Sequence, residues 1–65
     1  MKKYKVYDLY EGKLTLGYAD NMQEVKKLAR EQYEATDGEC SIYYAELNPE
    51  TNKYKFSEAR FLETF

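Results

Sequence analysis

The sequence predicts one α+β domain, in which an antiparallel four-stranded sheet carries a single helix on one face. The length of 65 residues leaves room for one small domain, residues 1–65. One central stretch has helical spacing of its apolar residues, and a pair of β-rich runs lies on each side of it. Each pair is joined by a short turn, which is typical of a hairpin. The expected order is therefore ββαββ.

The first hairpin is expected from two runs of β-forming residues at the start of the chain. These runs are Tyr4–Tyr10 and Leu14–Tyr18. Glu11, Gly12 and Lys13 lie between them, and a short connection that contains glycine predicts a tight turn.

The central helix is expected to run from about Asn21 to about Thr36. Its start is marked by Asp20 and Asn21, because either side chain can accept a hydrogen bond from the free amides of the first turn. Gly38 favours a left-handed end. Apolar residues then recur every three or four positions and form one stripe: Met22, Val25, Leu28, Ala29 and Tyr33.

The second hairpin is expected after Gly38. Residues Cys40–Leu47 are rich in β-formers, and the fourth strand is predicted from Tyr54 to about Leu62. The turn between them begins with Asn48 and Pro49, and Asn52 tolerates the left-handed conformation that closes such a turn.

Alternation along these strands assigns side chains to the two faces of the sheet. Under the helix we expect Tyr4, Val6, Leu14, Leu16, Ile42, Tyr44, Tyr54 and Phe56. One helix covers only part of a four-stranded sheet, so the eight Tyr and three Phe cannot all lie beneath it. The candidate interaction surface on the open face and the tail is Lys5, Tyr7, Leu9, Tyr43, Lys55, Phe61 and Phe65.

The charges are unevenly distributed, although the net charge is only −2. Residues 31–50 hold six acids and no Lys or Arg. The candidate acidic patch is Glu31, Glu34, Asp37 and Glu39. Such a patch either keeps a small protein soluble or meets a basic partner as a phosphate mimic would.

The composition argues against several classes of protein. With no His and one Cys, neither a disulfide framework nor a Cys/His zinc site is expected. Cys40 has no histidine to activate it and is expected to be a small buried residue. No membrane-spanning run or signal peptide is predicted. We therefore expect a cytoplasmic, non-enzymatic protein with no cofactor, metal, small-molecule substrate or membrane partner.

Two kinds of binding function are consistent with these features. The first is a protein partner or a second copy of the chain, a homodimer, bound through the open sheet face or an exposed edge strand. The alternative is single-stranded nucleic acid, with Tyr7 and Tyr43 stacking on bases and Lys5 and Lys55 on phosphates. The acidic balance of the whole chain disfavours nucleic acid.

Two short motifs and the opening run Tyr4-Lys5-Val6-Tyr7 carry a resemblance. The motifs are Thr36-Asp37-Gly38-Glu39-Cys40 and Leu47-Asn48-Pro49-Glu50-Thr51-Asn52-Lys53-Tyr54. Over most of its length the chain resembles short uncharacterised proteins of Gram-positive bacteria and their phages or mobile elements. The resemblance implies a context in which small accessory proteins act by binding a host protein, and it assigns no activity to any residue.

Overall fold

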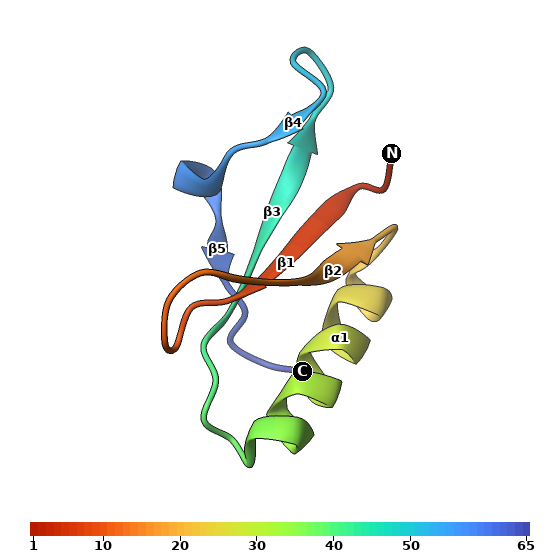
Figure 1. Cartoon of the computed structure of the whole chain (residues 1–65). Coiled ribbons are helices and arrows are strands. Elements are labelled where there is room, and N and C mark those ends of the chain that lie inside the picture. Colours follow the sequence, from red (N-terminus) through yellow and green to blue (C-terminus); the bar gives the residue numbers. More distant parts are fainter.

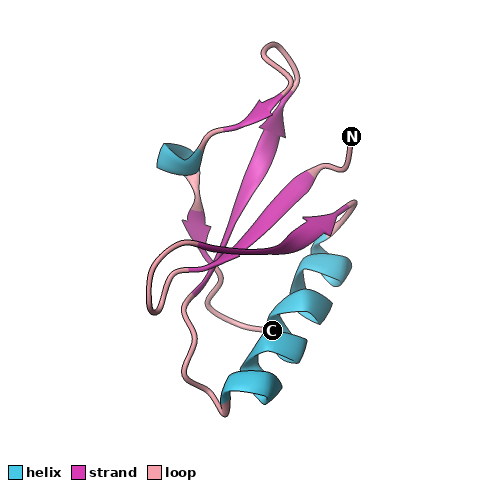
Figure 2. Cartoon of the chain, viewed as in Figure 1, coloured by secondary structure: helices cyan, strands magenta, loops and turns pink.

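The computed structural model describes all 65 residues and has the α+β character that the sequence predicts. Figures 1 and 2 show a single helix beside a strongly curled antiparallel sheet. Its elements are β1 (Tyr4–Asp8), β2 (Leu14–Ala19), α1 (Met22–Thr36), β3 (Ile42–Asn48), β4 (Lys53–Tyr54), a 3₁₀ turn η1 (Phe56–Glu58) and β5 (Arg60–Phe61). The ββαββ order is thus confirmed in outline, with the last strand divided.

The sheet has the order β2-β1-β3-β4, with β5 also paired to β3. The strands β1 and β3 are separated in the chain by β2 and the helix, and they lie side by side, with Val6 opposite Tyr44. The helix lies on one side of these strands, and the segment from β4 to β5 lies on the other (Figure 1). The second segment pairs with β3 at the edge of the sheet, and Phe56 of its turn η1 packs against Tyr7 on the face away from the helix.

A β-bulge in β2 bends the first hairpin. Val6 lies opposite Gly17 and Tyr7 opposite Thr15, so Leu16 is the extra residue of the bulge. Gly17 has a φ of 155°, and a side chain there would contact Leu28 of the helix. A glycine at this position allows the bulged strand to approach the helix closely.

The predicted continuous fourth strand is wrong. The strand β4 pairs with the end of β3, at Leu47 and Asn48, whereas β5 pairs with its start, at Tyr43 and Tyr44. The 3₁₀ turn η1 lies between these two short strands. A turn here shifts the alternation of side chains, so residues beyond it do not follow the phase set at Tyr54.

The helix begins and ends close to the predicted residues. The Asn21 side chain accepts a hydrogen bond from the Glu24 amide at 2.9 Å, and the Glu24 carboxylate accepts one from the Asp20 amide at 2.8 Å. This reciprocal arrangement resembles a capping box. At the other end Asp37 and Gly38 both have positive φ, and the Gly38 amide donates to the Tyr33 carbonyl.

The main core lies between α1 and the helix-covered face of the sheet. It consists of Tyr4, Val6, Ala19, Val25, Ala29, Ile42 and Leu62. The predicted partners Leu16, Tyr44 and Cys40 pack against it, half-buried. Leu62 is held at this core by its backbone, because its amide donates to the Ile42 carbonyl at 2.9 Å. The tail beyond β5 thus docks on its own chain.

Three residues expected under the helix lie elsewhere. Leu14 lies opposite Asp8 but is exposed, because it lies at the rim of a surface hollow. Tyr54 is opposite Leu47, which faces away from the helix. The ring of Phe56 packs against Tyr7, again on the far side of the sheet. The phase of the last strand was wrong because both faces of the sheet take up aromatic rings, so the apolar alternation of Tyr54 and Phe56 does not show which face they join.

Candidate binding surface

The side of the sheet opposite the helix carries most of the aromatic rings, and we call it the curled face. Cross-strand register places its residues on one side: Lys5 lies opposite Tyr18 and Ala45, Tyr7 opposite Tyr43, and Tyr43 opposite Phe61. The curled face consists of Lys5, Tyr7, Thr15, Tyr18, Tyr43, Ala45, Leu47, Tyr54 and Phe61, with Phe56 and Lys13 packed against it.

Three ring pairs cross the curled face. Their ring centroids are 5.3 Å apart for Tyr7 and Phe56, 5.5 Å for Tyr18 and Tyr54, and 5.4 Å for Tyr43 and Phe61. All three are tilted or edge-to-face, as aromatic pairs prefer. In each pair one ring is inner and the other outer, and the outer rings of Tyr18, Phe56 and Phe61 are 47%, 42% and 54% exposed.

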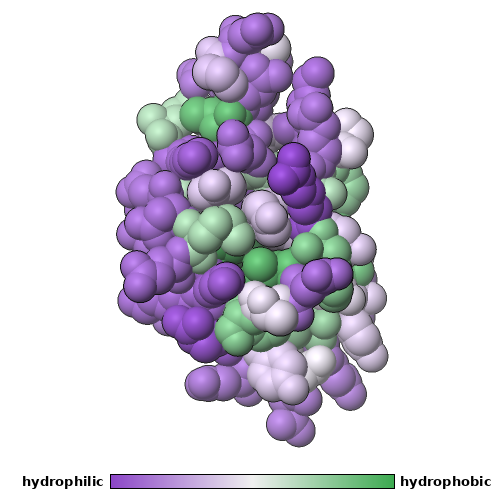
Figure 3. All heavy atoms as spheres, turned by 180° about the vertical axis from the view of Figure 1, so that it is seen from behind, coloured by the Kyte–Doolittle hydropathy of each residue, from purple (hydrophilic) through white to green (hydrophobic).

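The number of exposed rings confirms that the aromatic residues exceed what the helix can cover. Six aromatic side chains are exposed: Tyr10, Tyr18, Tyr33, Phe56, Phe61 and Phe65. Seen from behind, apolar and weakly hydrophilic side chains gather near the middle of the molecule, with strongly hydrophilic ones around them (Figure 3). Half of these exposed rings, those of Tyr18, Phe56 and Phe61, belong to one face of the sheet.

Two lysines of the curled face rest on aromatic rings. The Lys5 ammonium lies 5.3 Å from the ring centroid of Tyr7 and 5.8 Å from that of Tyr18. The Lys13 ammonium lies 4.3 Å from the ring centroid of Phe56. These are cation–π distances. Neither lysine has a carboxylate within ion-pair distance, because the one ion pair of the chain joins Lys2 and Asp20.

A shallow hollow of about 590 Å³ lies at the Tyr18–Tyr54 end of this face. Its lining has no carboxylate and consists of Met1, Lys2, Lys5, Tyr18, Asn52, Lys53 and Tyr54. The Tyr54 hydroxyl donates a hydrogen bond to the Lys2 carbonyl, which fixes the ring and the start of the chain together. Burial, and then the neighbouring Tyr18, raise the pKa of Tyr54, so the hydroxyl keeps the proton that it donates.

The structure brings together only part of the predicted interaction surface. Lys5, Tyr43 and Phe61 lie on the curled face. Tyr7 lies there too, but it is 1% exposed, so its ring backs Phe56 and cannot touch a partner. Lys55 is exposed beside η1.

Two other predicted residues lie apart from this surface. Leu9 follows β1, is half-buried, and donates its amide to the Ser41 carbonyl. The ring of Phe65 packs against Tyr33 of the helix, with 5.6 Å between centroids.

Sequence reasoning did not assign Tyr18, Tyr54, Phe56 or Lys13 to this surface. The turn residue Lys13 comes directly after Gly12, and its ammonium reaches a ring that lies far along the chain. Tyr18 lies opposite Lys5 only because the bulge at Leu16 shifts the register of the hairpin, so strict alternation along the strand did not place it on this face. No local signal placed Phe56, because its contact with Tyr7 depends on the turn η1.

The predicted acidic patch lies at the C-terminal end of α1, away from the lysines of the hollow. Glu31 and Glu34 are on the helix, Asp37 is its C-cap, Glu39 follows, and all four are exposed. The last turn of the helix contains no basic residue. Because this end of a helix is already negative, the patch is an electronegative pole of the molecule.

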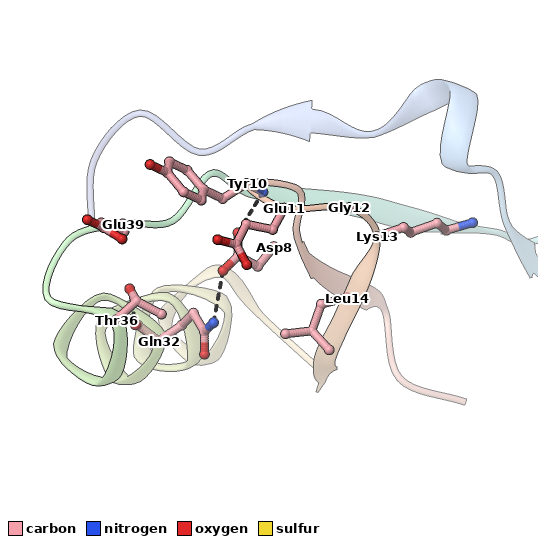
Figure 4. A pocket seen from close by; sticks show the side chains of 9 residues that line it. All are labelled: Asp8, Tyr10, Glu11, Gly12, Lys13, Leu14, Gln32, Thr36 and Glu39. Carbon is pink, nitrogen blue, oxygen red and sulfur yellow. Dashed lines mark hydrogen bonds between the residues drawn. The ribbon is translucent and has the colours of Figure 1, made fainter.

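A second hollow, of about 420 Å³, lies between the β1–β2 turn and α1 (Figure 4). Asp8 lies at its base and is buried. Its carboxylate accepts hydrogen bonds from the amides of Tyr10 and Ser41 at 3.0 Å each, and from the Gln32 side chain at 2.8 Å. Burial alone would raise the pKa of Asp8, but these three hydrogen bonds outweigh it and lower the pKa.

Asp8 therefore joins three segments of the chain and has its oxygens occupied. The same hollow is also lined by Glu11, Glu39 and Lys13 (Figure 4). No group of three or more His, Cys, Asp or Glu side chains is arranged to hold a metal ion. Asp8 thus stabilises the junction of the β1–β2 turn, the helix and the start of β3, and its carboxylate is not free to act as an acid or base.

The comparisons with known proteins add no family to these features. The chain contains no helix long and apolar enough to cross a membrane. No protein-family model, curated protein or solved structure matches this chain.

Proposed function

We propose that this chain is a non-enzymatic binding protein whose curled face docks a negatively charged macromolecular partner. The observation that carries the proposal is the combination of outward rings with lysines that have no carboxylate partner. Lys5 and Lys13 rest on rings, and Lys5 and Lys53 line a hollow without an acid. A partner with negative charge would supply the missing anions.

The placement of the reactive side chains supports a binding role over catalysis. Asp8, whose pKa is lowered, is held by three protein donors. Cys40 is half-buried against the core, and the chain has no histidine that could activate it. The exposed rings, by contrast, remain available at the surface, where aromatic residues contribute most to binding.

Amide chemical shifts would test the proposal without knowledge of the natural partner. Poly-L-glutamate is titrated into labelled protein at low salt, and we expect shifts at Lys5, Lys13 and Lys53 that disappear as salt is added. Lys5→Gln should weaken these shifts, while the matched helix variant Lys27→Gln should not. Shifts confined to α1, or no shifts at low salt, would contradict the proposal.

Self-association through β2 is a second candidate. The strand β2 ends the sheet, so its outer edge lacks a strand partner, and Leu14 and Tyr18 are exposed along it. Unpaired edges favour pairing with a second copy. Sedimentation equilibrium at micromolar concentration should then show a dimer that Leu14→Lys dissociates, and a monomer at all concentrations would exclude this candidate.

A further inference from the structure

The outer rings of the curled face form a row of flat, partly exposed surfaces, each supported from behind. Tyr18 leans on Tyr54, Phe56 on Tyr7, and Phe61 on Tyr43. The inner ring Tyr7 is fully buried, and Tyr43 and Tyr54 are half-buried. Each outer ring is therefore held in place while about half of it remains open to solvent.

Positive charge accompanies this row of rings. Lys5 lies between the rings of Tyr7 and Tyr18, and Lys13 lies over Phe56. Lys53 lines the hollow beside Tyr54. The one acid of this region that forms an ion pair, Asp20, faces Lys2 at 3.8 Å in a pair that is more than half exposed. Such exposed pairs contribute little and exchange readily for another anion.

The negative net charge of the chain does not oppose an anionic partner at this face. The acids Glu31, Glu34 and Asp37 lie at the C-terminal end of α1, and the helix is on the other side of the sheet from the curled face. The fold therefore places these three acids on the other side of the sheet from Lys5 and Lys53, whereas Glu11 and Glu39 line one hollow with Lys13 and Glu58 lies in η1 with Phe56. The local field at the curled face is what an approaching partner would meet.

We propose that the partner is single-stranded nucleic acid, an inference that rests on the proposed function of the curled face. Bases stack on the outer rings of Tyr18, Phe56 and Phe61, and Lys5, Lys13 and Lys53 contact the phosphates. A nucleic-acid strand carries one flat ring system and one negative charge in every repeat, which matches rings interleaved with lysines. An acidic protein supplies the charge, but its carboxylates leave the three rings without a stacking partner.

The test is the fluorescence anisotropy of labelled oligothymidylate of about twelve nucleotides, a length within the usual site size of such proteins. We expect salt-sensitive binding. Tyr18→Ala and Phe61→Ala should each weaken it by about 5- to 150-fold, the loss that corresponds to one stacked base. Tyr18→Phe keeps the ring and should keep the affinity. The control Tyr33→Ala removes an equally exposed ring from the helix and should change nothing.

The lysines provide an independent measurement. Lys5→Gln and Lys53→Gln should each reduce the slope of log affinity against log salt by about 0.7, the value for one phosphate of a single strand. Lys27→Gln on the helix should leave the slope unchanged. Circular dichroism of every variant establishes that it is folded, and Phe56 is left intact because its ring packs on buried Tyr7.

Two outcomes separate this inference from the proposed function. If poly-L-glutamate binds as tightly as the oligonucleotide and Tyr18→Ala affects neither, the curled face docks an acidic protein and nucleic acid is excluded. If neither probe binds at low salt, both proposals are overturned. Loss of oligonucleotide binding in Tyr33→Ala together with retention in Tyr18→Ala would also exclude stacking at the curled face.

Discussion

The two faces of the sheet bury their side chains in different ways. The helix-covered face is closed by small and aliphatic residues, and Val6, Ala19 and Ile42 are at most 1% exposed. No helix covers the curled face. Phe56 packs on Tyr7 there, and apart from Tyr7 and Ala45 the residues of this face stay partly exposed. Ring-on-ring contacts there take the place of a closed core.

This difference separates stability from recognition within a very small chain. A domain of this size has a thin core, so its folding free energy depends on a few fully buried residues. Those residues lie mainly on the helix-covered face. The curled face is then free to keep amphipathic tyrosines and lysines at the surface, where they contact water or a partner.

The largest expected effect is a truncation on the helix-covered face. Ile42→Ala should lower the free energy of unfolding by about 2–5 kcal/mol, because it leaves a cavity in the core. Phe61→Ala on the curled face should cost about 1 kcal/mol or less, since that ring is exposed. Urea unfolding measures both. If Ile42→Ala unfolds the protein, Ile42→Val should still show a loss of about 0.5–1.5 kcal/mol. Equal losses of unfolding free energy in Ile42→Ala and Phe61→Ala would contradict the view that stability depends mainly on the helix-covered face.

The next effect concerns Asp8, the one buried charged residue. Asp8→Asn should cost about 2 kcal/mol at neutral pH, because a charged acceptor of three hydrogen bonds is lost. Since the pKa of Asp8 is lowered in the fold, its contribution is present above the ordinary value of about 3.9. The contribution is lost as the pH falls through the lowered pKa.

The difference in unfolding free energy between the original chain and Asp8→Asn should therefore shrink as the pH falls below about 4. Unfolding curves in urea at neutral and acid pH measure it. The variant Gln32→Asn offers a matched control, because the shorter side chain withdraws one donor and keeps the Asp8 carboxylate. A difference that grows in acid would show that the Asp8 pKa is raised instead.

A smaller effect is expected at the start of α1, which supports only the helix-covered face. Asn21→Ala removes the acceptor for the Glu24 amide and should cost about 1 kcal/mol. Asn21→Ser keeps an acceptor and should cost less. Thermal unfolding followed by circular dichroism measures which of the two variants is less stable. Oligonucleotide affinity should not change in either variant if the curled face works independently of the helix.

The smallest effect is a gain in stability at the acidic pole. Glu34→Lys places a positive charge in a helix end that has no basic residue, and should stabilise the fold by about 0.3–1 kcal/mol at low salt. The gain should decrease as salt is added. A loss of stability would indicate that Glu34 makes a favourable contact that the substitution removes. An unchanged affinity for the oligonucleotide would show that the acidic patch does not take part in binding at the curled face.

Local features of the sequence predicted most of the elements. The helix bounds, the Asn21 cap, the end at Gly38 and the positive φ of Asn52 all depend on residues within a few positions of one another. The predicted first and third strands differ from β1 and β3 by two residues or fewer at each end. These features follow from backbone hydrogen bonding and turn chemistry, which act over short separations.

The candidate surface was only half predictable, and Tyr7 illustrates why. Alternation correctly placed Tyr7, Tyr43 and Lys5 on one face. The ring of Tyr7 is nevertheless buried, because Phe56 returns from near the other end of the chain and packs on it. Periodicity reports the side of a strand to which a residue points, and it does not report what later covers that side.

The amino-acid sequence by itself determined the order of the elements, the ends of the helix and the excess of aromatic rings over the area that one helix can cover. The tertiary structure alone decided the division of the last strand, the pairs that the rings form and the separation of the acidic helix end from the lysines of the hollow. The physical reason is the distance along the chain over which each kind of interaction acts. Caps and turns are set by neighbouring residues, whereas strand phase and ring contacts depend on packing between distant segments.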